Sequence, residues 1–187
     1  MPSTSNQGIG AKTAKAGVSE LESMLFESPN TESVCLKLAK LLHVRRCEVA
    51  LLRLEKNSLR FIFPVELRTA GVLPMTGSAV AARTAATRTP MLSNTFMRVR
   101  HVSLFEAIRL AGEEEDDKKL EQMPIQKIMS VPVLQAEGKV VGVVQVSHKG
   151  PDASLAGADF TAEDLKLLEQ AARVLACMPF MREGAEL

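Results

Sequence analysis

Residues 127–176 read KIMSVPVLQAEGKVVGVVQVSHKGPDASLAGADFTAEDLKLLEQAARVLA, and this stretch decides the fold. Residues 128–134 are apolar and rich in strand-forming side chains, and Glu137-Gly138 supplies a residue that adopts a positive φ at little cost. Residues 140–146 hold five valines, whose branched side chains suit a pleated sheet. The stretch therefore begins with a predicted β-hairpin.

A helix is predicted directly after this hairpin and a short polar loop. Thr161 suits the N-cap position, and Asp164 follows three residues later, as in a capping box. Phe160 and Leu165 have the spacing of a hydrophobic staple around that cap. We expect the rest of the chain to complete the sheet and to cover its two faces.

The N-terminal part of the chain predicts a tail followed by helices. Residues 1–16 are small and polar and predict a disordered tail, residues 17–180 a single domain, and residues 181–187 a C-terminal tail. Apolar spacing predicts a short helix over 18–28 and a second helix that is capped by Asn30 or Thr31 and ends near His43. A single longer helix kinked at Pro29 satisfies the same pattern.

The middle of the chain predicts a second hairpin and further helices. Residues 47–54 and 59–63 predict its strands, 64–76 an irregular link, 78–89 a short Ala-rich helix, and 90–93 a brief strand. Residues 96–111 contain a predicted helix, and the charged run 113–119 predicts a solvated loop. Antiparallel hairpins with helices between and around them define an α+β fold.

Composition argues against several classes of protein. No apolar run approaches the roughly 20 residues of a membrane-spanning helix, and the N-terminus lacks the apolar stretch of a secretory signal. A net charge of +1 and an aromatic content of 4% argue against nucleic-acid binding. The histidines show no metal-ligand spacing, so no metal site is expected; they are His43, His101 and His148.

Cysteine usage favours a reducing compartment. Cys35, Cys47 and Cys177 lie far apart in the sequence and form no C-x-x-C motif. An odd number of separated thiols is typical of a cytoplasmic protein with reduced cysteines. We therefore expect a cytoplasmic protein in which no two of these thiols are close enough to bridge.

The hairpin and final helix resemble the C-terminal half of a GAF domain, through the VP-containing strand, the EGK turn, VVGVVQVSHKG and DFTAEDLKLLEQAA. Residues 73–94, LPMTGSAVAARTAATRTPMLSN, are similar to the middle of that family, where a Gly precedes a short helix and a TP-x-x-x-N strand; these elements are Gly77, Thr89-Pro90 and Asn94. The resemblance spans about residues 30–178. It implies a central antiparallel sheet of five or six strands, with N- and C-terminal helices on one face and the roof of a ligand pocket on the other.

Two polar residues interrupt the apolar central strands. Alternation places Gln145 with Val141, Val143 and Ser147 on one face of its strand, and Ser130 also lies in an apolar strand. Because an unpaired buried polar group costs roughly 1–3 kcal/mol, both need partners. A ligand or pocket water could pair with Ser130 and Gln145, and a neighbouring backbone group could do so equally well.

The resemblance locates a candidate pocket beneath the roof helix of residues 96–111. Arg98, Arg100 and His101 form a basic cluster at its border, which either binds an anionic ligand or offsets the nearby acidic run. The candidate ligand-binding residues are Phe96, Arg98, Arg100, His101, Phe105, Ser130 and Gln145.

Specialised GAF signatures are weak or missing. Lys149, Phe160 and Asp164 match the pattern of cyclic-nucleotide-binding members, whereas His148 and Leu165 depart from it. Lys149 and Asp164 are instead predicted to form a structural ion pair. Residues 95–125 contain no cysteine for attachment of a bilin.

The sequence favours a non-catalytic sensory domain of the GAF type that binds an unidentified small molecule, with no cofactor implied. One alternative is an enzyme that reduces free methionine sulfoxide, but the cysteines lie outside the expected pocket loops. Another is a degenerate GAF scaffold that binds only proteins. We expect no output domain outside residues 30–178 of this sequence, so regulation is expected to act through a partner protein or a dimer.

The final helix favours a homodimer through the terminal helices. Leu165, Leu168, Ala172 and Leu175 form one apolar stripe of that helix, and a second stripe comprises Leu167, Ala171, Val174 and Met178. One stripe suffices to cover a sheet, so the second is a candidate contact with another chain. The alternative is one wide stripe used entirely inside the monomer.

Overall fold

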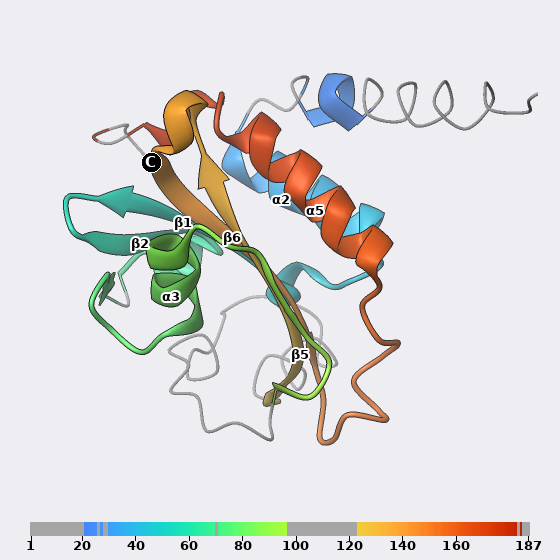
Figure 1. Ribbon diagram of the computed structural model, residues 1–187. Helices are drawn as coiled ribbons and strands as arrows, with labels where there is room; N and C mark the ends of the chain where they lie inside the picture. Colours follow the sequence, from blue (N-terminus) through green and yellow to red (C-terminus); the bar gives the residue numbers. More distant parts are fainter. Residues whose placement is uncertain are drawn as a thin grey trace, which may run out of the picture.

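The computed structural model describes residues 21–25, 27, 30–69, 71–96, 123–182 and 184. Six antiparallel strands form one sheet in the order β3-β2-β1-β6-β5-β4. The strands are β1 Val49–Glu55, β2 Ser58–Phe63, β3 Val72–Pro74, β4 Met91–Ser93, β5 Ile125–Leu134 and β6 Val140–Lys149. The predicted α+β class and antiparallel sheet are confirmed (Figure 1).

Helices cover both faces of this sheet. Two of them, α2 Thr31–Leu41 and α5 Ala162–Leu175, lie side by side on one face, and α3 Val80–Thr87 lies on the other (Figure 1). Residues 21–25 are also helical. Short 3-10 turns complete the described part of the chain: η1 Arg46–Glu48, η2 Val65–Leu67, η5 Ala136–Gly138 and η6 Pro179–Met181.

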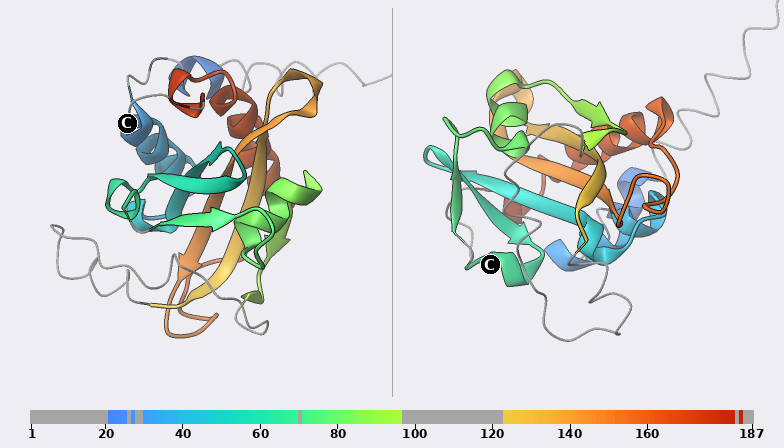
Figure 2. Two further views of the ribbon diagram at one scale, coloured as in Figure 1. Left: turned by 90° about the vertical axis from the view of Figure 1, so that its left-hand side faces the viewer. Right: turned by 90° about the horizontal axis from the view of Figure 1, so that it is seen from below.

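The sheet separates two apolar cores. The larger core contains the inner sides of α2 and α5 together with Val144 and Val146 of β6. The smaller core lies between the sheet and α3 and includes Phe61, Phe96 and Val143. Two further views show α3 on the β5–β6 part of the sheet, where β4 forms the edge beside β5 (Figure 2).

Local capping signals behave as the sequence predicts. Asn30, rather than Thr31, is the N-cap of α2, and its Oδ1 accepts a hydrogen bond from the Ser33 amide at 2.9 Å. At α5, Thr161 Oγ1 accepts from the Asp164 amide at 3.1 Å, while Asp164 Oδ2 accepts from the Thr161 amide at 2.7 Å. The predicted capping box is therefore confirmed.

The β5–β6 turn has two consecutive residues with positive φ. Glu137 has φ 71° and Gly138 has φ 73°. The Gly138 amide donates to Gln135 O at 3.1 Å, and the Gln135 amide donates to Lys139 O at 2.9 Å. This backbone twist matches that of a tight hairpin and confirms the predicted turn.

The expected strict alternation of β6 fails at its start. Val133 pairs with Gly142 but Leu134 pairs with Val140, so Val141 is an extra residue in β6. This bulge places Val140 and Val143 in the α3-side core and Val141 in the core beneath the terminal helices. The prediction that Val141 shares a face with Val143 is wrong, because the bulge resets the alternation.

Other boundaries differ modestly from the predictions. The link over 64–76 contains the short strand β3, and β5 starts at Ile125 rather than near residue 128. Met181, assigned from sequence to the C-terminal tail, is 1% exposed and belongs to the core. The predicted tail over 1–16, the bend at Pro29, most of the predicted 96–111 helix and the charged run 113–119 lie outside the described residues.

Candidate functional site

A buried trio of polar side chains joins α3 to the centre of the sheet. Ser130 of β5 and Gln145 of β6 lie directly opposite each other in the ladder. Thr84 of α3 donates from Oγ1 to Ser130 Oγ at 2.8 Å, and Gln145 donates from Nε2 to the same oxygen at 3.1 Å. All three side chains are buried, at 3%, 0% and 7% exposure for Thr84, Ser130 and Gln145.

The trio keeps unused hydrogen-bonding capacity. Ser130 Oγ accepts two hydrogen bonds, so its own hydroxyl proton is available for donation. Gln145 Oε1 accepts no hydrogen bond from any residue that the structure describes. A carboxamide oxygen in an otherwise buried side chain is a natural acceptor for a bound donor group.

The trio lies on the sheet face that carries α3, opposite α2 and α5, as the sequence argument assumed for Ser130 and Gln145. The sequence left open a ligand or pocket water and a neighbouring backbone group as partners, but Ser130 and Gln145 have side-chain partners. The hydrogen bond from Thr84 was not predicted. The available signal was a threonine whose neighbours in the helix include three buried alanines: Ala81, Ala82 and Ala85.

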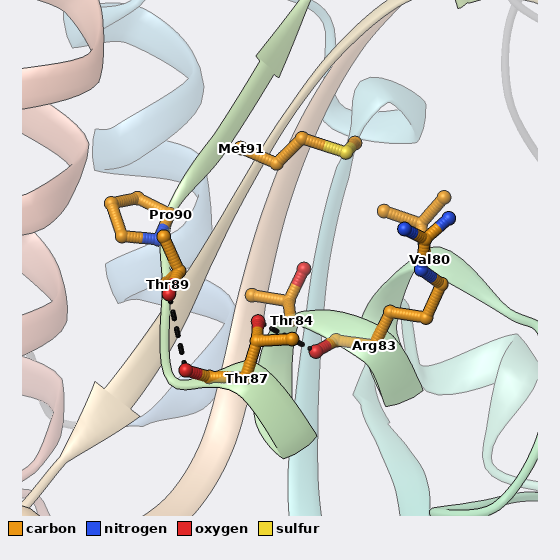
Figure 3. Close-up of a pocket in the computed structure, with 7 residues that line it drawn as sticks. All are labelled: Val80, Arg83, Thr84, Thr87, Thr89, Pro90 and Met91. Carbon is orange, nitrogen blue, oxygen red and sulfur yellow. Dashed lines mark hydrogen bonds between the residues drawn. The ribbon is translucent and has the colours of Figure 1, made fainter.

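A hollow of about 320 Å³ adjoins the trio, between α3 and β4 (Figure 3). Thr84 contributes to both the trio and the hollow. The rim is fixed by side-chain hydrogen bonds, because Thr87 Oγ1 donates to Arg83 O at 2.9 Å and Thr89 Oγ1 donates to Thr87 O at 3.1 Å. The hollow is lined by Val80, Arg83, Thr84, Thr87, Thr89, Pro90 and Met91.

The other sequence-predicted pocket residues are only partly covered by the structure. Phe96 is 3% exposed and belongs to the α3-side core, together with Met91 at its margin. Arg98, Arg100, His101 and Phe105 lie outside the described residues. The described part of the candidate site is therefore the trio, the hollow and Phe96.

The expected Lys149–Asp164 ion pair is not found among the contacts of these two described residues. Asp164 uses its carboxylate in the capping box with Thr161. The Lys149 amide donates to Glu48 Oε1 at 2.7 Å, which ties the end of β6 to η1. Local capping thus takes the carboxylate that the prediction assigned to a longer-range pair.

The three cysteines are free thiols outside the hollow. Cys35 belongs to α2 and is fully buried, and this burial raises the pKa of its thiol, opposed by the nearby charge of Arg46. Cys47 is also buried, whereas Cys177 is exposed at the end of α5. A buried thiol with a raised pKa is a poor nucleophile.

Within the described ranges, no group of three or more His, Cys, Asp or Glu side chains is placed to hold a metal ion. No described helix is both long and apolar enough to span a bilayer.

The GAF domain family matches residues 31–177, which is well over half of the chain. The chain belongs to the GAF domain family. The resemblance stated from the hairpin and the TP-x-x-x-N segment is thus confirmed. A search of curated proteins found no match.

Solved structures share this fold at low sequence identity. The GAF domain of an Acinetobacter phosphoenolpyruvate-protein phosphotransferase is 13% identical, with a TM-score of 0.61 and 92% of each chain covered. A putative GAF sensor protein from Burkholderia vietnamiensis is 16% identical, with a TM-score of 0.55 and coverage of 89% of this chain and 93% of that one.

Enzymes are also among the similar structures. The type II free methionine-R-sulfoxide reductase from Thermoplasma acidophilum is 16% identical, with a TM-score of 0.51 and coverage of 83% of this chain and 92% of that one. At such identities the likeness concerns the fold. The shared fold is therefore compatible with both a catalytic and a non-catalytic GAF domain.

Proposed function

We propose that this GAF domain is a non-catalytic sensor that binds a small molecule on the α3 face of the sheet. The observation that carries the proposal is Gln145 Oε1, which accepts no hydrogen bond from any described residue although its side chain is 7% exposed and donates to Ser130. Polar atoms of such side chains usually have a hydrogen-bond partner. A ligand that donates a hydrogen bond to this oxygen would complete the pairing.

The neighbouring hollow supports the same location and suggests the ligand's character. Its apolar wall comes from Val80, Pro90 and Met91, and Arg83 provides the one cationic side chain among its described lining residues. Ligand sites commonly combine an apolar wall with a few fixed polar groups. We expect a mainly apolar small molecule with at least one N–H or O–H donor.

The cysteines support the absence of redox catalysis. Reduction of methionine sulfoxide by thiols needs an accessible thiolate and a second thiol that resolves the oxidised intermediate. The two thiols packed in the interior, Cys35 and Cys47, are buried, and Cys177 is exposed at the far end of α5. Free thiols also support the proposed cytoplasmic location.

Signal output through a partner chain or a homodimer belongs to the same proposal. The residues that support the dimer contact differ from those expected from the sequence. Ala171, Val174 and Met178, from the second stripe of α5, are buried within the chain itself. Leu36 of α2 is 37% exposed, and Leu167, the remaining member of the second stripe, is half-buried. These two residues are the candidate contact.

Ligand retention tests the proposal. Wild-type protein and Gln145→Leu are each incubated with the low-molecular-weight metabolite fraction of a cell extract, separated by gel filtration and examined by native mass spectrometry. We expect a retained small molecule on the wild type that is lost from Gln145→Leu and kept by the control Gln170→Leu on α5. Protein that retains nothing favours the scaffold that binds only proteins, and turnover of free methionine sulfoxide with a thiol reductant favours the enzyme.

A further inference from the structure

The threonine hydroxyls that line the hollow between α3 and β4 donate their protons within the protein. Thr84 Oγ1 donates to Ser130 Oγ at 2.8 Å. Thr87 Oγ1 donates to Arg83 O at 2.9 Å, and Thr89 Oγ1 donates to Thr87 O at 3.1 Å. Because a hydroxyl has one proton and two lone pairs, each of these threonine oxygens is left as a hydrogen-bond acceptor.

These acceptors belong to one hollow (Figure 3). Thr84 and Thr87 are three residues apart on α3 and therefore lie on the same side of the helix, and Thr89 lies just after its C-terminal end. The apolar lining residues are Val80, Pro90 and Met91, and no carboxylate belongs to the described lining residues. The hollow therefore combines an apolar wall with several acceptor oxygens.

Gln145 adds a further acceptor close to Thr84. Its Nε2 donates to Ser130 Oγ at 3.1 Å, and this is the same oxygen to which Thr84 donates. Its Oε1 accepts no hydrogen bond from a described residue. The buried trio and the hollow beside it therefore both favour a ligand that supplies donors.

The charge of the lining residues favours a neutral ligand. Arg83 is the one charged side chain among the described lining residues, and it is exposed. Its positive charge opposes a cationic ligand, and no carboxylate of the described lining compensates it. A guanidinium that is open to water adds little to the binding of an anion.

We propose that the hollow selects a compact neutral compound with at least two O–H donors on an apolar frame, such as a diol or a dihydroxybenzene. The donors bind the oxygens of Thr84, Thr87 and Thr89, and the frame packs on Val80 and Met91. A compound with acceptors alone would place its lone pairs against those of the threonines and leave them unpaired, which disfavours it. This inference rests on the proposed function, because it names the ligand class of the same pocket.

Methyl NMR of the wild type with resorcinol as the probe tests the proposal. Resorcinol is expected to shift the methyl signals of Val80 and Met91 in a saturable way. Two analogues are expected to bind at least roughly fivefold more weakly: meta-difluorobenzene, which has nearly the same shape but no O–H donor, and resorcinol dimethyl ether, which carries only acceptors. Equal or tighter binding of either analogue, or no saturable response to resorcinol, would overturn the proposal.

Matched substitutions locate the contacts. Thr87→Val removes one acceptor while nearly keeping the shape of an exposed side chain, whereas Thr87→Ser keeps the acceptor. Resorcinol is expected to bind roughly threefold more weakly to Thr87→Val and to Thr89→Val, and as tightly as in the wild type to Thr87→Ser. Unchanged binding in both valine variants would show that the threonine oxygens do not hold the donors, which contradicts the proposal.

The results also separate this inference from the proposed function. A metabolite that is retained by the wild type and lost from Gln145→Leu, together with no preference for resorcinol, would reject the donor class and leave the sensor proposal in place. Selective binding of resorcinol by a protein that retains no metabolite would support the donor class, and only the sensor proposal would fail.

Discussion

Asn94 and Phe160 exchange two hydrogen bonds although 66 residues separate them. Asn94 Nδ2 donates to Phe160 O at 3.0 Å, and the Phe160 amide donates to Asn94 Oδ1 at 3.0 Å. A carboxamide is suited to this task because it carries one donor and one acceptor on adjacent atoms. The pair joins the end of β4 to the residue that precedes the α5 cap.

Asn94→Asp keeps the shape of the side chain but replaces the amide donor with a second oxygen. The carboxylate then faces Phe160 O without a proton, so we expect a loss of about 1–3 kcal/mol in the free energy of unfolding at neutral pH. Urea denaturation measures this loss. Asn57→Ala in the exposed β1–β2 turn serves as the control, and an equal loss in that variant would contradict the assignment.

Removal of the shared oxygen of the trio is expected to destabilise the protein. Ser130→Ala leaves the Thr84 hydroxyl and the Gln145 amide without their acceptor in a buried site, at a cost of about 1–3 kcal/mol. In a double-mutant cycle, Thr84→Val should cost less in the Ser130→Ala background than in the wild type. Strictly additive losses would show that Thr84 and Ser130 do not interact.

The stabilisation by Glu55 is expected to depend on pH. Burial opposes ionisation of Glu55, but the hydrogen bonds and charges of Arg53 and Arg60 outweigh it and lower the pKa of the carboxyl. The folded state thus binds the proton less tightly than the unfolded chain, whose Glu pKa is about 4.3. The stabilisation is therefore complete above that pH and is lost as the pH falls through the folded pKa.

Denaturation of Glu55→Gln at pH 7 and pH 3 measures this dependence. We expect the variant to be about 1 kcal/mol less stable than the wild type at pH 7 and nearly equal to it at pH 3. Glu169→Gln on α5, which makes no ion pair with another described residue, should show no such change. A deficit of Glu55→Gln that persists at pH 3 would assign the loss to packing rather than to charge.

The thiols are expected to differ in reactivity. In the native protein, a thiol reagent such as Ellman's reagent should react quickly with the exposed Cys177 and slowly with the buried Cys35 and Cys47. All three should react at once in guanidinium chloride. If a natively folded Cys177→Ser variant still reacts quickly, one of the two buried thiols must be reactive, and this would contradict the prediction.

Sedimentation at low micromolar concentration tests the homodimer. We expect a species of twice 20.3 kDa that dissociates on Leu36→Glu or Leu167→Glu while the variants remain folded. Val174→Glu should instead unfold the chain, at a cost of about 3 kcal/mol or more, because Val174 is 3% exposed within its own core. A wild-type species that stays at 20.3 kDa at every concentration would end the dimer hypothesis.

Sequence alone determined the features that depend on neighbouring residues. The Thr161 cap, the Glu137-Gly138 turn and the β5–β6 hairpin each involve contacts within a few residues, so their chemical requirements are visible in a short window. The order of these elements was also sufficient to indicate the GAF fold. Each local preference agreed with the final architecture, which is why these predictions held.

Only the tertiary structure decided the features that join distant segments. Thr84 and Ser130 meet across 46 residues, and no local pattern specifies which helix residue lies above a given strand position. The bulge at Val141 and the burial of Ala171, Val174 and Met178 from the second stripe of α5 likewise depend on how β5 and α2 pack beside their neighbours. Side-chain periodicity defines the possible faces of a helix or strand, and long-range packing selects which of them are buried.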